Sequence, residues 1–104
     1  MKIPCEYSGG GLKKTTTYST AYNNATSFIL IILTATLNGY NYNFSFVIPK
    51  DMITSSETVF LNGAAHQSNA WYVTIGITSS IVAPAVYHNN SGDGITKSLT
   101  YYYD

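Results

Sequence analysis

Residues 25–49 read ATSFILIILTATLNGYNYNFSFVIP and contain two β-rich runs on either side of Asn38-Gly39. A type I′ turn needs positive φ at both central residues, and Asn followed by Gly tolerates this best, so the pair predicts a tight β-hairpin. After the turn, apolar and polar residues alternate, which predicts a strand with one buried face and one wet face. The predicted buried face consists of Tyr40, Tyr42, Phe44, Phe46 and Ile48.

Before the turn, Phe28–Leu33 is a run of six large apolar residues with no polar face. Successive residues of a strand point to opposite sides, so packing two sheets together buries only half of this run. Full burial of one such side chain is worth about 1.5–3 kcal/mol, so the other half needs cover. A loop or the N-terminal arm could supply it, but we favour self-association, with either the odd-numbered or the even-numbered set against another chain. The predicted interface residues are Phe28, Ile29, Leu30, Ile31, Ile32 and Leu33.

The rest of the chain is also rich in residues that favour strands, and helix formers do not accumulate at a period of 3.6 residues. The sequence therefore predicts an all-β fold, an antiparallel β-sandwich that is jelly-roll-like and has seven or eight short strands. Residues 13–104 form this single domain, and residues 1–12 are a flexible, glycine-containing leader. The predicted strands span residues 12–22, 26–37, 40–48, 57–67, 70–83, 84–88 and 95–104, with a short helical turn or loop in 50–56 and a tight turn or bulge at Asn62-Gly63.

The zero net charge and the short apolar runs of the sequence argue against several classes of partner. The 104 residues include five basic and five acidic side chains, so the net charge is zero and no basic stripe is available for nucleic acid. The longest apolar run is far below the roughly 20 residues that a membrane-spanning helix needs, and the first residues lack a secretory signal. We expect no membrane insertion and synthesis in a bacterial cytoplasm. Cys5 is the single cysteine, so no disulfide forms within one chain.

No motif predicts catalysis, a metal or a cofactor. His66 and His88 are separated by 22 positions and have no acid or cysteine at a metal-binding offset. The sequence has no Gly-x-Ser-x-Gly elbow, and its five carboxylates are too scattered to indicate a glycosidase pair. We therefore predict that the protein is not an enzyme. A hydrolase that uses one of the two histidines is the remaining catalytic alternative, and only substrate turnover would support it.

Two polar segments are candidate binding regions. Residues 85–90, AVYHNN, place aromatic rings beside amides, a combination that is used in sugar and peptide recognition. Residues 62–69 supply a second group of amides and a histidine. The alternative is that both are polar loops without a binding role, and that Gly92-Asp93-Gly94 is only a tight turn. The predicted binding residues are Asn62, His66, Gln67, Asn69, Tyr87, His88, Asn89, Asn90 and Asp93.

A glycine-containing leader is followed by a weakly charged domain rich in Thr, Tyr and Asn, which closes on the aromatic run KSLTYYYD, residues 97–104. This pattern over residues 13–104 resembles the small C-terminal tip domains of bacteriophage tail-fibre and baseplate receptor-binding proteins. The resemblance implies a homotrimeric β-sandwich that belongs to a virion and binds a host-surface glycan without catalysis. Unlike those proteins, this chain is expected to have no fibre or coiled-coil segment before the domain. The alternative is therefore a capsid or tail decoration module whose only partners are phage structural proteins.

Overall fold

The computed structural model describes residues 11–37, 40–66, 70–79, 85–88 and 96–104. These residues form a mostly antiparallel β-structure with little helix, which confirms the all-β prediction. The short helical turn predicted in residues 50–56 is present as a 3-10 helix. The elements are β1 (Lys13–Thr15), α1 (Tyr18–Asn24), β2 (Phe28–Leu37), β3 (Tyr40–Pro49), η2 (Lys50–Met52), β4 (Val59–His66), β5 (Ala70–Ile77), β6 (Ala85–His88) and β7 (Thr96–Tyr103).

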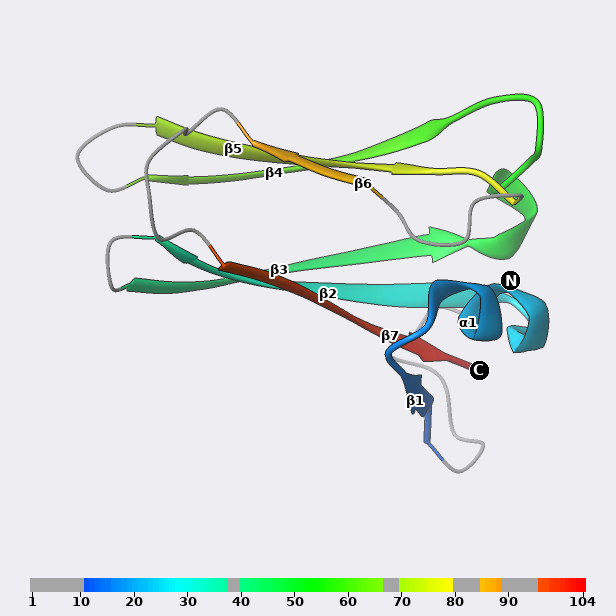
Figure 1. Cartoon of the computed structure of the whole chain (residues 1–104). Helices are drawn as coiled ribbons and strands as arrows, with labels where there is room; N and C mark the ends of the chain where they lie inside the picture. The colour runs from blue at the N-terminus through cyan, green and yellow to red at the C-terminus, as the bar shows by residue number, and fades with distance from the viewer. Residues whose placement is uncertain (1–10, 38–39, 67–69, 80–84, 89–95) are drawn as a thin grey trace.

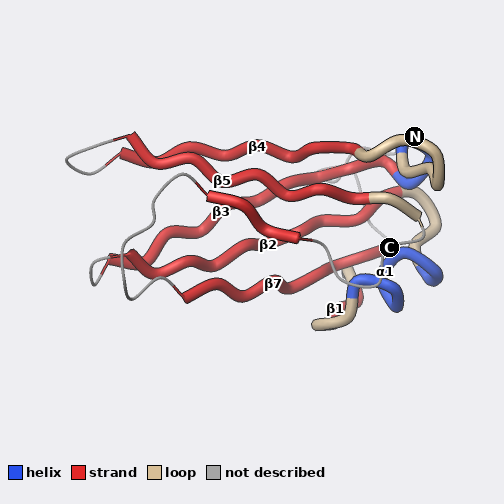
Figure 2. Tube along the Cα trace, turned by 45° about the horizontal axis from the view of Figure 1, so that its top comes forward, coloured by secondary structure: helices blue, strands red, loops and turns tan. Residues whose placement is uncertain are grey.

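The strands form two sheets that lie one above the other (Figures 1 and 2). One sheet has the order β1-β7-β2-β3 and the other has the order β4-β5-β6, with antiparallel pairing throughout. β2 and β3 pair continuously from Phe28↔Pro49 to Leu37↔Tyr40. This register confirms the hairpin pairing of the two runs, while Asn38-Gly39 lies outside the described residues.

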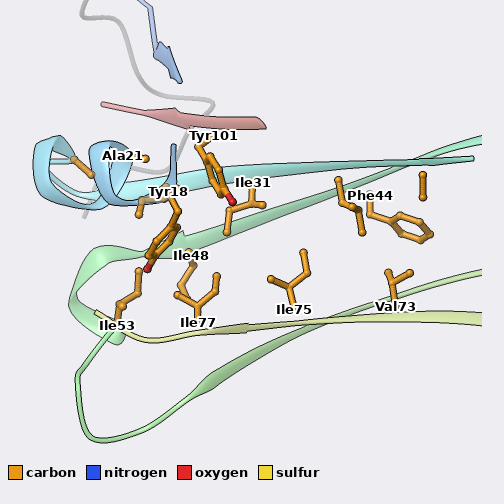
Figure 3. Packing of buried hydrophobic residues seen from close by; sticks show 14 residues of the cluster. Tyr18, Ala21, Ile31, Phe44, Ile48, Ile53, Val73, Ile75, Ile77 and Tyr101 are labelled. Atoms are coloured by element: carbon orange, nitrogen blue, oxygen red, sulfur yellow. The ribbon is translucent and has the colours of Figure 1, made fainter. Parts of the chain in front are cut away.

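The hydrophobic core lies between the two sheets, where side chains from both layers meet (Figure 3). The four-stranded sheet contributes the odd-numbered residues of β2, and the three-stranded sheet contributes the odd-numbered residues of β5. Phe44 and Ile48 of β3 are also buried, as the alternation in this strand predicts. The buried side chains of β2 and β5 in this cluster are Ile29, Ile31, Leu33, Ala35, Val73, Ile75 and Ile77.

Burial within the chain contradicts half of the predicted interface between chains. Ile29, Ile31 and Leu33 have no exposed surface because they pack against the second sheet of the same chain, so the interface prediction is wrong for them. The even-numbered set points to the other side of β2. Within that set Phe28 is only 1% exposed, so the prediction that another chain covers this face now depends on Leu30 and Ile32, which are partly exposed.

The prediction of one strand over residues 12–22 is wrong after Thr15, because α1 begins at Tyr18. Tyr18 and Ala21 are one helical turn apart and are both buried, whereas a strand would place them on opposite faces. The Tyr18 ring lies edge-on to Tyr101, with 5.7 Å between ring centroids, and its hydroxyl donates to the Thr78 carbonyl oxygen at 3.3 Å. The helix thus closes one end of the core (Figure 3).

The prediction of a turn or bulge at Asn62-Gly63 is also wrong, because both residues lie inside the regular register of β4 with β5. Gly63 is opposite Val73 and faces the core. A Cβ atom at Gly63 would lie 2.6 Å from Cδ1 of Phe44, on the facing sheet. The glycine therefore allows close approach of the two sheets instead of reversing the chain.

The end of β7 is fastened to the start of β2 through Asp104. Its carboxylate accepts hydrogen bonds from the backbone N–H groups of Thr26, Ser27 and Phe28, at distances from 2.9 to 3.3 Å. Burial raises the pKa of Asp104, but the N–H donors of Ser27, Phe28 and Thr26 outweigh it and hold the pKa below its ordinary value.

Within the described residues, no helix is long and apolar enough to cross a membrane.

Candidate ligand-binding face

The outward face of the three-stranded sheet is formed by residues that alternate with the core residues of β4 and β5. Val73, Ile75 and Ile77 point into the core, so the intervening residues of β5 point away from it. We call the surface formed by these residues and their partners on β4 the outer aromatic face. Its cross-strand pairs are Phe60↔Gly76, Asn62↔Thr74, Ala64↔Tyr72 and, at the end of the ladder, His66↔Ala70.

Two aromatic rings stand exposed on this face. Phe60 is 59% exposed and Tyr72 is 53% exposed, although phenylalanine is among the residue types that are most often buried. Tyr72 lies four residues along β5 from Gly76, the partner of Phe60, which corresponds to about 13 Å along the strand. The two rings therefore flank a stretch of sheet that is long enough for two or three sugar-sized groups.

A polar pair lies between the two rings. The Thr74 hydroxyl donates a hydrogen bond to Asn62 Oδ1 at 2.8 Å, and both side chains are at the surface. This bond orients the Asn62 amide so that its two N–H donors remain available to a ligand. The Thr74 oxygen likewise keeps capacity to accept a hydrogen bond. The centre of the outer aromatic face thus offers donors and an acceptor side by side.

Gly76 brings the Phe60 ring close to the β5 backbone. A Cβ atom at this position would lie 3.5 Å from Phe60 Cε1 and 3.3 Å from Thr58 Cγ2. Gly76 is itself buried although it lies on the outward side of the strand, because the ring and the threonine methyl cover it. The ring is therefore supported from beneath while much of its surface stays exposed.

The sheet register unites two of the sequence-predicted binding residues. Asn62 is opposite Thr74, and Thr74 is opposite Tyr87, so residues from the two predicted segments occupy one row across the three strands. His88 stands opposite the inward residue Val73, and His66 stands opposite Ala70 at the end of the ladder. Both histidines are therefore outside this row, but the register places His66 at the end of the outer aromatic face, whereas His88 has the parity of the inward residues. The other predicted residues, Gln67, Asn69, Asn89, Asn90 and Asp93, lie outside the described residues.

Sequence reasoning missed Phe60 and Tyr72 as site residues. For Tyr72 the signal was present, since it alternates with Val73 and Ile75 and so belongs to the outward face of its strand. For Phe60 the signal was ambiguous, because Val59 and Leu61 on the opposite parity are equally apolar. Only the packing of Val59 and Leu61 against the core shows that Phe60 faces outward.

The described cross-strand pairs of the outer aromatic face contain no charged side chain. In the part of the chain that the structure describes, no group of three His, Cys, Asp or Glu residues is arranged to hold a metal ion. The face therefore offers ring surface and uncharged hydrogen-bonding groups. Comparisons with protein-family models, with curated proteins and with solved structures find no match for this chain.

Proposed function

We propose that the protein is a non-catalytic, saccharide-binding β-sandwich of jelly-roll type, and that the outer aromatic face is its binding surface. The observation that carries the proposal is the placement of two exposed rings, Phe60 and Tyr72, on either side of the Asn62–Thr74 pair. The proposal keeps saccharide recognition as the function. It moves the centre of the site from the loops to the face of the three-stranded sheet.

The chemistry of the face matches that of a sugar ring. A pyranose has an apolar face of C–H groups and a rim of hydroxyl groups that donate and accept hydrogen bonds. A flat aromatic ring covers the first, and a neighbouring amide and hydroxyl pair with the second, as in binding sites that combine aromatic surface with a few polar groups. Phe60 and Tyr72 supply the aromatic surface, and Asn62 supplies the amide.

Nucleic-acid bases also stack on aromatic rings that are presented by a sheet, so base stacking is the competing explanation of the exposed rings. Binding of a single strand also requires Lys or Arg near the phosphates, because the phosphate backbone dominates affinity. The cross-strand pairs of the outer aromatic face carry no such residue, and the whole chain has zero net charge. The same lack of charge favours a neutral glycan over one that contains uronic or sialic acid.

Within this proposal, the protein acts as a receptor-binding or surface-attached component of a bacteriophage-type virion, and its ligand is a saccharide of the host surface. The resemblance to tail-fibre tip domains supports this context. The second candidate is a decoration module with protein partners only. Its support is the partly exposed aliphatic surface on the outward face of the four-stranded sheet, where Val47 is 49% exposed.

A printed array of neutral and acidic bacterial surface polysaccharides tests the proposal. We expect neutral polysaccharides to bind the wild-type protein, and Phe60→Ala and Tyr72→Ala each to weaken binding tenfold or more, about 1.4 kcal/mol. Met52→Ala is the matched control, because Met52 is 58% exposed but lies on η2, outside the face. A blank array, or hits that survive both aromatic substitutions, would contradict the saccharide site.

A further inference from the structure

The outer aromatic face is built from rows that cross β4 and β5. Three successive rows are Phe60–Gly76, Asn62–Thr74 and Ala64–Tyr72. Neighbouring rows are two residues apart on each strand, which is about 6.6 Å. The first and third rows each hold one aromatic ring, and the middle row holds the hydrogen-bonded polar pair. Along the strands the face therefore has the order ring, polar pair, ring.

The two rings are separated along the strands much more than across them. Phe60 and Tyr72 lie on adjacent strands, which are about 4.8 Å apart, whereas their rows are about 13 Å apart along the sheet. A line between the two residues therefore runs close to the direction of β4 and β5, which lie side by side in Figure 1. A ligand that contacts both rings must extend in this direction, and a single six-membered sugar ring is too short to do so.

Each aromatic ring has a small residue as its cross-strand partner. Gly76 is opposite Phe60, and a Cβ atom at Gly76 would lie 3.5 Å from Cε1 and 3.8 Å from Cδ1 of that ring. The Phe60 ring therefore leans over β5. Ala64, opposite Tyr72, extends only to its methyl group. In neither of these two pairs does a second large side chain compete with a ligand for the ring.

The middle row is lower than the rows on either side, because Asn62 and Thr74 have short side chains. The hydrogen bond of 2.8 Å from the Thr74 hydroxyl to Asn62 Oδ1 holds the pair across the two strands. The amide N–H groups of Asn62 then lie between the rings and can donate to a group that spans them. The hydroxyl groups of a sugar between the two stacked units are acceptors of this kind.

We infer that the outer aromatic face binds one extended, linear segment of a neutral polysaccharide, at least three pyranose units long, whose axis follows β4 and β5. One unit stacks on Phe60 and another stacks on Tyr72. The unit between them lies over the Asn62–Thr74 pair. The inference rests on the proposed function, and it adds the shape and the minimum length of the ligand.

The competing arrangement is two independent sites, with one sugar at each ring. A single chain has an advantage over two separate sugars, because contact with one ring makes contact with the other intramolecular. The high effective concentration of the second unit raises the affinity without any new contact. The two arrangements therefore differ in how the affinity depends on the length of the oligosaccharide.

Isothermal titration with oligosaccharides of increasing length tests the inference. The probes are single sugars to hexasaccharides, prepared by partial hydrolysis of the neutral polysaccharide that binds best on the array. The tetrasaccharide should bind the wild-type protein at one site per chain and about tenfold or more tightly than the disaccharide, because only the longer probe covers both rings. The hexasaccharide should add less than about threefold, since it only gains alternative registers on the same two rings.

Phe60→Ala and Tyr72→Ala each leave a single ring, so either substitution should remove most of the gain with length. In both variants the tetrasaccharide should bind less than about threefold more tightly than the disaccharide. Met52→Ala, at a residue that is 58% exposed on η2 and outside the face, should keep the wild-type length dependence. Circular dichroism checks that each variant folds.

The outcomes separate the inference from the proposed function. A single sugar or disaccharide that binds as tightly as the tetrasaccharide overturns the inference but leaves saccharide binding at the face intact. So does a tetrasaccharide that occupies two sites per chain, or a length dependence that is kept in both single-ring variants. A blank array, or array hits that survive both aromatic substitutions, would contradict the proposed function and the inference together.

Discussion

The two sheets of this protein alternate inward and outward residues in the same way, but their outward faces differ in how apolar groups are arranged. On the three-stranded sheet, Phe60 and Tyr72 stand apart from each other with a polar pair between them. On the four-stranded sheet, Leu30, Ile32 and Val47 lie side by side. Separated rings around hydrogen-bonding groups fit the linked rings of a saccharide, whereas contiguous aliphatic surface fits another protein surface. The arrangement of apolar groups, more than their number, distinguishes the two faces.

The comparison of the two faces depends on which side of each strand points into the core. Substitutions of two neighbouring residues on β2 test this, and they have the largest expected effect on the free energy of unfolding. Ile31 has no exposed surface, and Ile32 is partly exposed. Ile31→Ala should lower the free energy of unfolding by about 2–5 kcal/mol, because it leaves a cavity in the core. Ile32→Ala should cost less than about 1 kcal/mol in the monomer. Urea unfolding at low micromolar concentration measures both, and equal losses would mean that the inward side is misassigned.

Substitution of two glycines tests the inward and outward sides of the three-stranded sheet in the same way. Gly63→Ala places a Cβ 2.6 Å from the Phe44 ring in the core and should cost about 1–3 kcal/mol. Gly76→Ala, on the outward side, meets Thr58 at 3.3 Å and Phe60 at 3.5 Å, and both side chains can move toward solvent. We expect Gly76→Ala to cost less than Gly63→Ala in thermal or urea unfolding. Partial recovery of Gly63→Ala by the added change Phe44→Leu would identify the ring contact as the cause.

Tyr101 on β7 provides a smaller, pH-dependent test, because its side chain points into the core. Burial raises the pKa of Tyr101 to about 12, since the charged phenolate is disfavoured in the core. A raised pKa in the folded state means that stability is fully present below pH 10 and is lost as the pH rises toward 12. The urea midpoint should fall over this window. Tyr101→Phe should reduce that fall; a fall of the same size in Tyr101→Phe and in the wild type would contradict the burial of Tyr101.

The β2–β3 hairpin was predictable from sequence because its signals are local. Asn38-Gly39 marks the turn, and the alternation after it identifies the inward residues of β3. Helix α1 was not predictable, because YSTAYNN has weak helix propensity and no cap side chain bonds its first turn. Its stability comes from tertiary contacts, namely Tyr18 with Tyr101 and with the Thr78 carbonyl.

The candidate site was predictable only in part for a similar reason. Asn62 and Tyr87 were identified from their residue types, but their common row across Thr74 depends on the pairing of strands that are distant in sequence. The exposure of Phe60 depends on which parity of β4 meets the core, and both parities contain large apolar residues. The pairing of β4, β5 and β6 depends on contacts between residues that are distant in sequence, so local alternation indicated the outward position of Tyr72 but not that of Phe60.

The central claim is that the saccharide binds to the outer aromatic face and not to the outward face of the four-stranded sheet. Isothermal titration with a soluble oligosaccharide from the neutral polysaccharide that binds best on the array tests it most directly, with Kd expressed per site. The account predicts that Phe60→Ala weakens the per-site affinity tenfold or more, and that Ile32→Glu, on the outward face of the four-stranded sheet, keeps the wild-type value within about twofold. An unchanged affinity in Phe60→Ala, or an equal loss in both variants, would contradict it.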